Sequence, residues 1–144
     1  MAKNAPSACN RQSWRTYVFT NKKLIEEILL TQGGNRGFGH LANKLIVISG
    51  NVSVFGGSHE RNQVFIDGGI YAMNVLYALH FNEIAACILN CSFDIEYDQK
   101  LRKLCGIKDS EVFITMIACG LPVDSFKVAL SPRKDLSQTN CIIN

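Results

Sequence analysis

Few residues of this sequence are arranged for acid–base catalysis. The three histidines, His40, His59 and His80, show no fixed spacing to one another or to a carboxylate. A serine-nucleophile elbow, a phosphate-binding Walker loop and a zinc-binding H-E-x-x-H helix are also missing from the sequence. The glycine-rich segment 33–39 precedes a predicted strand instead of opening a helix after one, which excludes a dinucleotide-binding turn. An enzyme with this sequence would therefore take its reactive group from a bound cofactor.

Polar side chains that could hold such a cofactor begin at Ser7. This serine follows a proline, and Asn10, Gln12 and Trp14 come after it at short intervals, ahead of an apolar alternation at residues 17–19. Hydroxyl and amide side chains offer both donors and acceptors of hydrogen bonds. The same residues also suit a turn that binds nothing, because Pro, Ser and Asn all favour turns.

Three more loops carry polar or charged candidates. These candidates are Asn35 and Arg36 in the glycine-rich segment, Asn90 and Cys91 after a predicted strand, and Arg133 near the C-terminus. Arginine suits a phosphate, because its guanidinium can donate two parallel hydrogen bonds to phosphate oxygens. Asn35 alternatively tolerates the left-handed backbone of a glycine loop. The residues at 90 and 91 alternatively suit a plain turn, and Arg133 suits an exposed surface.

Six cysteines leave a redox or metal-binding protein as a second interpretation. Cys87 and Cys91 are separated by three residues, but neither a second pair nor a nearby histidine completes a zinc site. Most of the cysteines stand among apolar neighbours, as reduced thiols in a protein core do. No secretory signal is visible in the first twenty residues, so the sequence predicts a reduced, cytoplasmic protein.

Hydrophobic periodicity predicts alternating strands and helices. The predicted strands cover residues 17–19, 45–49, 84–89 and 111–119, and the predicted helices cover residues 22–30, 63–79 and 94–105. The runs 45–49 and 84–89 are continuously apolar, which predicts buried strands. The segment 63–79 is apolar on almost every side, which predicts a helix buried in the core or between subunits. Asp67, near the start of this helix, is expected to interact with the helix dipole. Residues 141–143 form an apolar tail that could add an edge strand. This order of elements predicts an α+β or α/β domain.

Composition narrows the class of protein further. With 144 residues, of which 47% are apolar, the chain is long enough for one domain with a substantial core. Only 19% of the residues are charged, which indicates that a partner subunit covers part of the surface. The net charge of +3 is spread along the chain and predicts no basic face for nucleic acid. No run reaches the roughly 18 apolar residues that predict a membrane span.

Taken in order, these segments resemble the nitroreductase family of FMN-dependent NAD(P)H oxidoreductases. The resemblance rests on the Pro-Ser-x-x-Asn order of the first loop, Asn35 ahead of a central strand, residues 66–70 of the long helix, Leu89-Asn90-Cys91, and Ser131-x-Arg133. It implies a nitroreductase-like α+β domain, with a central, mostly antiparallel sheet flanked by helices. It also implies a homodimer with the flavin site at the subunit interface.

The resemblance further implies which residues bind FMN, and that none of them acts as an acid or base. The implied cofactor-binding residues are Ser7, Asn10, Asn35, Arg36, Leu89, Asn90, Cys91 and Arg133. Ser7 and Asn10 would belong to a loop that crosses to the partner subunit. The backbone of residues 89–91 would direct an N–H at the flavin ring, and Arg133 would bind the phosphate. NAD(P)H would be the electron donor, and a quinone, a nitro compound or a related small molecule would be the acceptor.

Two departures from the family pattern oppose this interpretation. The family's Arg-Arg-Ser-x-Arg segment, which normally supplies much of the phosphate grip, has no counterpart before Ala5, and Ser13 replaces the usual proline after Gln12. These departures predict a single domain over residues 1–144 that is truncated at its N-terminus. The alternative is a non-catalytic homodimeric remnant or fragment that does not retain flavin. A ligase-like or dehalogenase-like reaction also stays open, because a fold does not fix a reaction.

Overall fold

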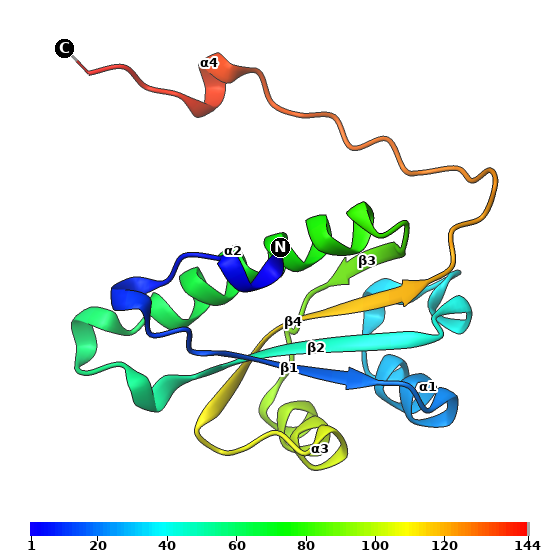
Figure 1. The fold of residues 1–144 in the computed structure, drawn as a ribbon, viewed down its shortest axis with the longest axis horizontal. Coiled ribbons are helices and arrows are strands. Elements are labelled where there is room, and N and C mark those ends of the chain that lie inside the picture. Colours follow the sequence, from blue (N-terminus) through cyan, green and yellow to red (C-terminus); the bar gives the residue numbers. More distant parts are fainter. Residues whose placement is uncertain (144) are drawn as a thin grey trace.

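The computed structural model describes residues 1–143, which are built around a four-stranded antiparallel sheet (Figure 1). Across the sheet the strands follow the order β1 (Trp14–Phe19), β2 (Lys44–Asn51), β4 (Glu111–Gly120) and β3 (Ala85–Leu89). Every neighbouring pair is antiparallel, and the pairing of β2 with β4 shifts register between Ile48 and Ser49. The antiparallel sheet predicted from the sequence is therefore confirmed.

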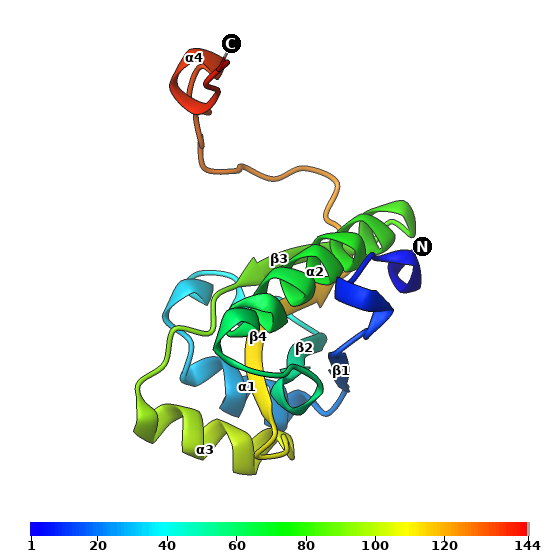
Figure 2. The same ribbon diagram turned by 90° about the vertical axis from the view of Figure 1, so that its left-hand side faces the viewer.

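Helices cover both faces of this sheet (Figure 2). Helix α2 (Gln63–Phe81) packs on one face, whereas α1 (Lys22–Leu30) and α3 (Ile95–Cys105) pack on the other. Successive residues of a strand point to opposite faces, so β2 contributes to two separate hydrophobic clusters. Its Ile46 and Ile48 pack with α2, and its Leu45 and Val47 pack with α1 and α3.

Capping residues explain where α1 begins and where α3 begins and ends. Asn21 precedes α1 and accepts a hydrogen bond from the backbone N–H of Leu24 at 3.2 Å. Asp94 precedes α3 and accepts one from the N–H of Tyr97 at 2.9 Å. Gly106 follows α3 in the left-handed region, with φ of 67°, as a helix-ending glycine does. The predicted boundaries of these two helices are correct to within one residue.

Short helices fill several of the connections. The 3₁₀ turns are η1 (Ala2–Asn4), η2 (Ala8–Asn10), η3 (Gly33–Asn35), η4 (Gly39–Leu41), η5 (Val52–Val54) and η6 (Ser58–Glu60). A one-turn helix, α4 (Leu136–Thr139), lies near the C-terminus.

Two predictions about the edges of the sheet are wrong. Strand β3 was expected to be buried, but residues 85–88 are exposed and only Leu89 is buried, because β3 lies at the edge of the sheet. Residues 141–143 do not form an edge strand in this single chain.

Helix α2 is buried on one side only. The residues that face the sheet side include Val64, Ala72 and Val75, whereas the opposite side exposes an apolar stripe of Ile66, Ile70, Met73 and Tyr77 at 39–57% of their surface. By length and composition alone, residues 58–81 could cross a membrane. In this structure α2 forms one layer of the domain, and its apolar stripe is exposed to solvent.

The last part of the described chain leaves the domain as an extended segment (Figure 1). We call residues 121–143 the C-terminal arm. Its apolar side chains are exposed over 59–92% of their surface at Leu121, Val123, Phe126, Val128 and Leu130. An arm of this composition has most of its apolar surface available to a partner.

Candidate functional site

The segment from Ser7 to Gln12, called here the Ser7–Gln12 loop, has an unusual backbone. Three of its residues that are not glycine have positive φ angles: Cys9 at 51°, Asn10 at 55° and Gln12 at 48°. Side chains with a Cβ disfavour this region, and each such residue costs about 1 kcal/mol or more. The surrounding structure must therefore hold the loop in this shape.

Asp67 of α2 provides one anchor for the loop. Its Oδ2 accepts a hydrogen bond from the backbone N–H of Ala8 at 3.1 Å, and its Oδ1 accepts one from Gln63 Nε2 at 2.7 Å. Asp67 is 1% exposed. We had expected this aspartate to interact with the dipole at the start of the helix. It instead lies one turn further on, beyond the first turn of α2, and bonds the loop.

Arg11 and Ser7 provide further anchors. Arg11 Nη1 lies 2.5 Å from Glu60 Oε1, and its guanidinium stands over the ring of Phe55. Ser7 Oγ accepts a hydrogen bond from the N–H of Gln12 at 3.0 Å. Asn10 remains exposed at the outer side of the loop.

A second cluster of predicted residues forms around Gln32, which follows the C-terminus of α1. Gln32 is buried, and its Nε2 donates to the backbone carbonyl of Asn90 at 3.2 Å. Asn35 donates from Nδ2 to the carbonyl of Leu29 at 2.8 Å and also to that of Gln32. Through Gln32, these bonds connect Asn35 to the loop at residues 90–91. The sequence analysis missed Gln32; the only sequence signal was its place between the predicted helix and Gly33-Gly34.

Cys91, next to this cluster, has a thiol of low reactivity. Burial, followed by the nearby Cys105 and Asp98, raises the pKa of Cys91 to about 12. A thiol with this pKa stays protonated at neutral pH and is a poor nucleophile and metal ligand. Within residues 1–143, no three His, Cys, Asp or Glu side chains lie where they could hold a metal ion.

The other cysteines only partly follow the prediction of core thiols. All six are free; Cys105 and Cys119 are buried, and Cys91 is half-buried. Cys9, Cys87 and Cys141 are exposed, so the prediction that most of the cysteines lie in the core is wrong. Apolar neighbours in the sequence did not indicate burial for two of these, because Cys87 lies on the edge strand and Cys141 on the C-terminal arm.

The structure does not bring the remaining predicted residues together. Leu89 is buried at the end of β3 beside Asn90, and Arg36 is exposed in the loop between η3 and η4. Arg133 is exposed on the C-terminal arm, where its Nη1 donates to the carbonyl of Ser131 at 2.9 Å.

Figure 1 shows that the two candidate regions of one chain are also separated. The Ser7–Gln12 loop lies beside the N-terminal half of α2, whereas η3, which contains Asn35, lies at the other end of the sheet. The candidate residues of one chain therefore form two separate groups on the domain.

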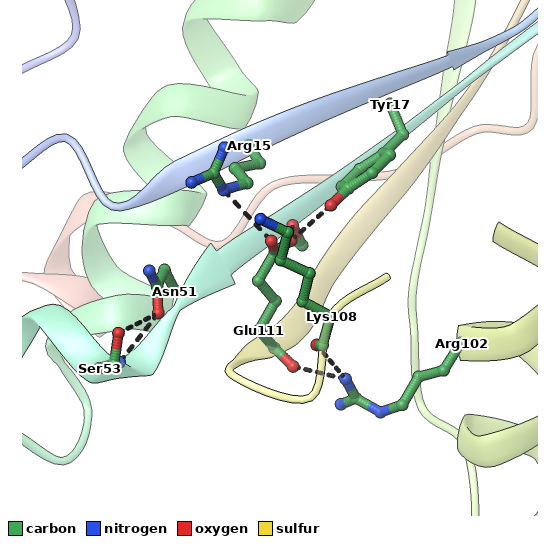
Figure 3. A network of polar contacts seen from close by, with 8 residues as sticks. Arg15, Tyr17, Asn51, Ser53, Arg102, Lys108 and Glu111 are labelled. Carbon is green, nitrogen blue, oxygen red and sulfur yellow. Dashed lines mark hydrogen bonds and ion pairs between the residues drawn. The ribbon is translucent and has the colours of Figure 1, made fainter. Parts of the chain in front are cut away.

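A buried carboxylate that the sequence did not reveal joins three strands (Figure 3). Glu111 is fully buried, and its Oε2 accepts hydrogen bonds from Tyr17 Oη at 2.9 Å and from Ser49 Oγ. Arg15 Nε lies 3.2 Å from its Oε1, and Arg102 Nη1 donates to its backbone carbonyl at 2.6 Å. Burial, and then the bond to Glu111, raises the pKa of Tyr17. This network fixes β1, the strand that follows the Ser7–Gln12 loop.

Comparisons with known proteins agree with this architecture. The model of the nitroreductase family matches residues 1–35, which include the Ser7–Gln12 loop. An FMN-dependent nitroreductase from Clostridium difficile R20291 superposes with a TM-score of 0.74 at 19% identity, over 90% of this chain and 75% of that one. A nitroreductase with bound FMN from Desulfitobacterium hafniense DCB-2 gives a TM-score of 0.67 at 21% identity, over 99% and 82% of the two chains.

The chain has the nitroreductase fold. A third structure, assigned as an NADH dehydrogenase/NAD(P)H nitroreductase from Parabacteroides distasonis ATCC 8503, gives a TM-score of 0.78 at 19% identity, over 95% of this chain and 77% of that one. No curated protein sequence matches the chain. The resemblance to the nitroreductase family that the sequence suggested is thus confirmed, in sequence over residues 1–35 and in fold over nearly the whole nitroreductase-like domain.

Proposed function

We propose that this nitroreductase-like domain binds FMN and works as a flavin-dependent oxidoreductase. One observation carries the proposal: the part of the sequence that matches the nitroreductase family contains the Ser7–Gln12 loop, and the chain around that loop has the nitroreductase fold. Two structures with this fold are named as FMN-dependent or contain FMN, which supports the choice of cofactor.

The described residues fit the chemistry of FMN. The polar edge of the flavin ring needs neutral donors and acceptors, and the exposed Asn10 and Asn90 offer both. The phosphate needs cations, and Arg36 and Arg133 are exposed and form no ion pair within residues 1–143. When bound, FMN would supply the two-electron chemistry, and these residues would bind and orient it.

We propose further that the functional unit is a homodimer. The Ser7–Gln12 loop and the cluster around Asn35 lie apart in one chain, so a second copy is needed to place both against one flavin. The apolar stripe of α2 and the C-terminal arm offer the surface for such an assembly, because both expose large apolar side chains. The arm also carries Arg133, which a second copy could bring into the site.

NAD(P)H is our proposed electron donor, and a quinone, a nitro compound or a related small molecule is our proposed acceptor. The names of the structures from Parabacteroides distasonis and Clostridium difficile support this choice. The donor and acceptor would use the flavin in turn, each exchanging two electrons with it.

The visible absorption spectrum of the purified protein tests the proposal. After addition of FMN and desalting, we expect flavin absorption to remain with the protein and to be bleached by NADH or NADPH without oxygen. Arg133→Ala should weaken FMN binding by about tenfold, the loss of one charge-assisted contact. Lys134→Ala, an exposed cation next to it, is the matched control and should bind as the wild type does.

The opposite result would favour the non-catalytic alternative. A folded dimer that stays colourless and shows no affinity for FMN would overturn the proposed function. Sizing by analytical ultracentrifugation separates that outcome from a failure to assemble.

A further inference from the structure

The feature that the proposed function leaves unexplained is the buried aspartate below the Ser7–Gln12 loop. Asp67 lies 59 positions from Ala8 in the sequence, yet its Oδ2 accepts the N–H of Ala8 at 3.1 Å. Its other oxygen is occupied by Gln63 Nε2 at 2.7 Å, and the residue is 1% exposed. The carboxylate is therefore fixed in place and directed at the backbone of the loop.

We propose that Asp67 is a positioning residue for the cofactor site: it holds the Ser7–Gln12 loop in its left-handed conformation before FMN binds. The inference rests on the proposed function, because it gives Asp67 a role only if this loop contacts FMN. The bond to Ala8 enters the loop directly before Cys9 and Asn10, the first two residues with positive φ. An anchor at this point prevents the loop from relaxing to the extended or right-handed backbone that these residues prefer.

The other hydrogen bonds of the loop backbone are local. The N–H of Asn10 donates to the carbonyl of Ser7 at 3.0 Å, the N–H of Arg11 to that of Ala8 at 3.1 Å, and the N–H of Gln12 to Ser7 Oγ at 3.0 Å. All three close short turns within the loop, so none of them ties it to the rest of the domain. Among the described residues, the polar ties to the domain are the bond to Asp67 and the ion pair of Arg11 with Glu60, and the Arg11 guanidinium also stands over the ring of Phe55.

These two ties differ in strength. Arg11 and Glu60 expose 30% and 21% of their side chains, and a pair so accessible to water and salt holds weakly. Asp67 is shielded from water and accepts a hydrogen bond from the backbone itself. Glu60→Gln is therefore a matched control: it removes a carboxylate tie to the same loop, but from the surface.

Loss of the Asp67 anchor should lower the fraction of molecules with the binding-ready loop. The apparent dissociation constant rises in inverse proportion to that fraction, so a loop that is ordered one-tenth of the time binds FMN about tenfold more weakly. The effect on FMN binding should exceed that of Glu60→Gln.

Hydrogen exchange on the flavin-free protein tests the anchor directly. In Asp67→Ala we expect the amides of residues 10–12 to exchange about tenfold faster or more, while those of β2 keep the wild-type rate. Because Asp67 is buried and this variant could misfold, Ala8→Pro is the second variant. It removes the donor N–H from the half-buried loop, leaves Asp67 in place and follows Ser7, whose ψ of 157° suits a residue before proline. Asp67→Asn, which keeps an oxygen acceptor, should recover part of the protection.

FMN titration of the same variants tests the role in binding. We expect the dissociation constant to rise about tenfold in Asp67→Ala and Ala8→Pro, less in Asp67→Asn, and least in Glu60→Gln. Unchanged loop exchange in both Asp67→Ala and Ala8→Pro would overturn the anchor, and faster exchange with an unchanged dissociation constant would overturn the positioning role. Wild-type protein that does not bind FMN would overturn the proposed function itself, and the role of Asp67 with it.

Discussion

The two loops that carry the candidate residues are held by different means. The Ser7–Gln12 loop has three left-handed residues and depends on side chains from elsewhere in the chain, Asp67 and Glu60. The turn around Asn35 is held by amide groups that bond nearby carbonyls, together with the buried Gln32.

This difference determines how each loop can respond to a ligand or a mutation. The first loop stores backbone strain and can open when a distant carboxylate is lost. In the second, Asn35 is locked by bonds to carbonyls within six positions of it in the sequence, so its turn changes shape only if packing around Asn35 is forced apart. We therefore expect mutations of the anchoring residues to disturb the Ser7–Gln12 loop. We expect the turn around Asn35 to be disturbed by substitutions that add side-chain volume next to it.

The largest expected contrast concerns the thiol that each region carries. Cys9 is exposed on the first loop, whereas Cys91 is half-buried beside the second and has a pKa of about 12. At pH 8 only about one Cys91 in ten thousand would be ionised, so it should react with a maleimide at least a hundredfold more slowly than Cys9. Peptide mapping by mass spectrometry after short labelling measures both rates. Equal rates would show that the second region opens as readily as the first.

The raised pKa of Cys91 also predicts how the free energy of unfolding depends on pH. The pKa of Cys91 in the folded state, about 12, lies above its ordinary value of 9.0, so the folded protein favours the protonated thiol. The stabilisation is complete below about pH 9 and is lost as the pH rises from there toward 12. Cys91→Ala should make this part of the stability curve less steep, with the remaining slope coming from Cys105 and Cys119, whose pKa values burial raises to about 11; urea unfolding between pH 8 and 10.5 measures it. An unchanged slope would contradict the assignment.

The second largest effect is expected from a methyl group added next to Asn35. A Cβ at Gly39 would overlap Asn35 Oδ1 and lie 2.9 Å from its Cγ, and Asn35 cannot move away because its amide is bonded to two carbonyls. Gly39→Ala should destabilise the fold by about 2 kcal/mol, as overpacking does. Gly33→Ala is the control, since its Cβ would meet nothing within 4 Å.

The double variant Asn35→Ala/Gly39→Ala tests whether the overlap with Asn35 causes the destabilisation. In Asn35→Ala the obstacle is gone, so adding Gly39→Ala should cost far less than it does alone. Additive effects on the free energy of unfolding would mean that Asn35 does not lock this turn.

Much of the fold followed from the sequence, because its signals are local. Apolar periodicity and caps such as Asn21 and Gly106 gave the helices α1 and α3 nearly to the residue. The burial of β3 was mispredicted, since an apolar run does not tell a central strand from an edge strand.

The site was harder to predict, because its decisive bonds join residues far apart in the sequence. The order of polar residues identified Asn35 and Asn90 as candidates, but not Gln32, which connects them. Asp67 looked like a helix-dipole residue until the structure placed Ala8 above it. Glu111 looked like an ordinary first residue of a strand, and only the fold reveals its buried partners.

A smaller effect should come from the backbone of the first loop. Cys9 is exposed with φ of 51°, so a substitution there tests backbone strain with little change in packing. Cys9→Val should destabilise by about 1 kcal/mol, because a β-branched side chain disfavours this region, whereas Cys9→Gly should not. Thermal unfolding of the pair measures the difference. Equal stability would show that the loop does not keep its left-handed shape in solution.

The smallest effect is expected at the surface tie of the same loop. The bond from Arg11, and then that from the N–H of Gly56, lowers the pKa of Glu60, so this pair stabilises the fold above the ordinary pKa of 4.5 and less as the pH falls through the lowered value. Glu60→Gln should therefore change loop exchange by no more than about twofold at pH 7, and salt should remove the difference. Glu26→Gln, which breaks the exposed pair with Lys22 on α1, is the control for a general effect of charge. A change as large as that of Asp67→Ala would mean that the loop is held from the surface and not from the buried carboxylate.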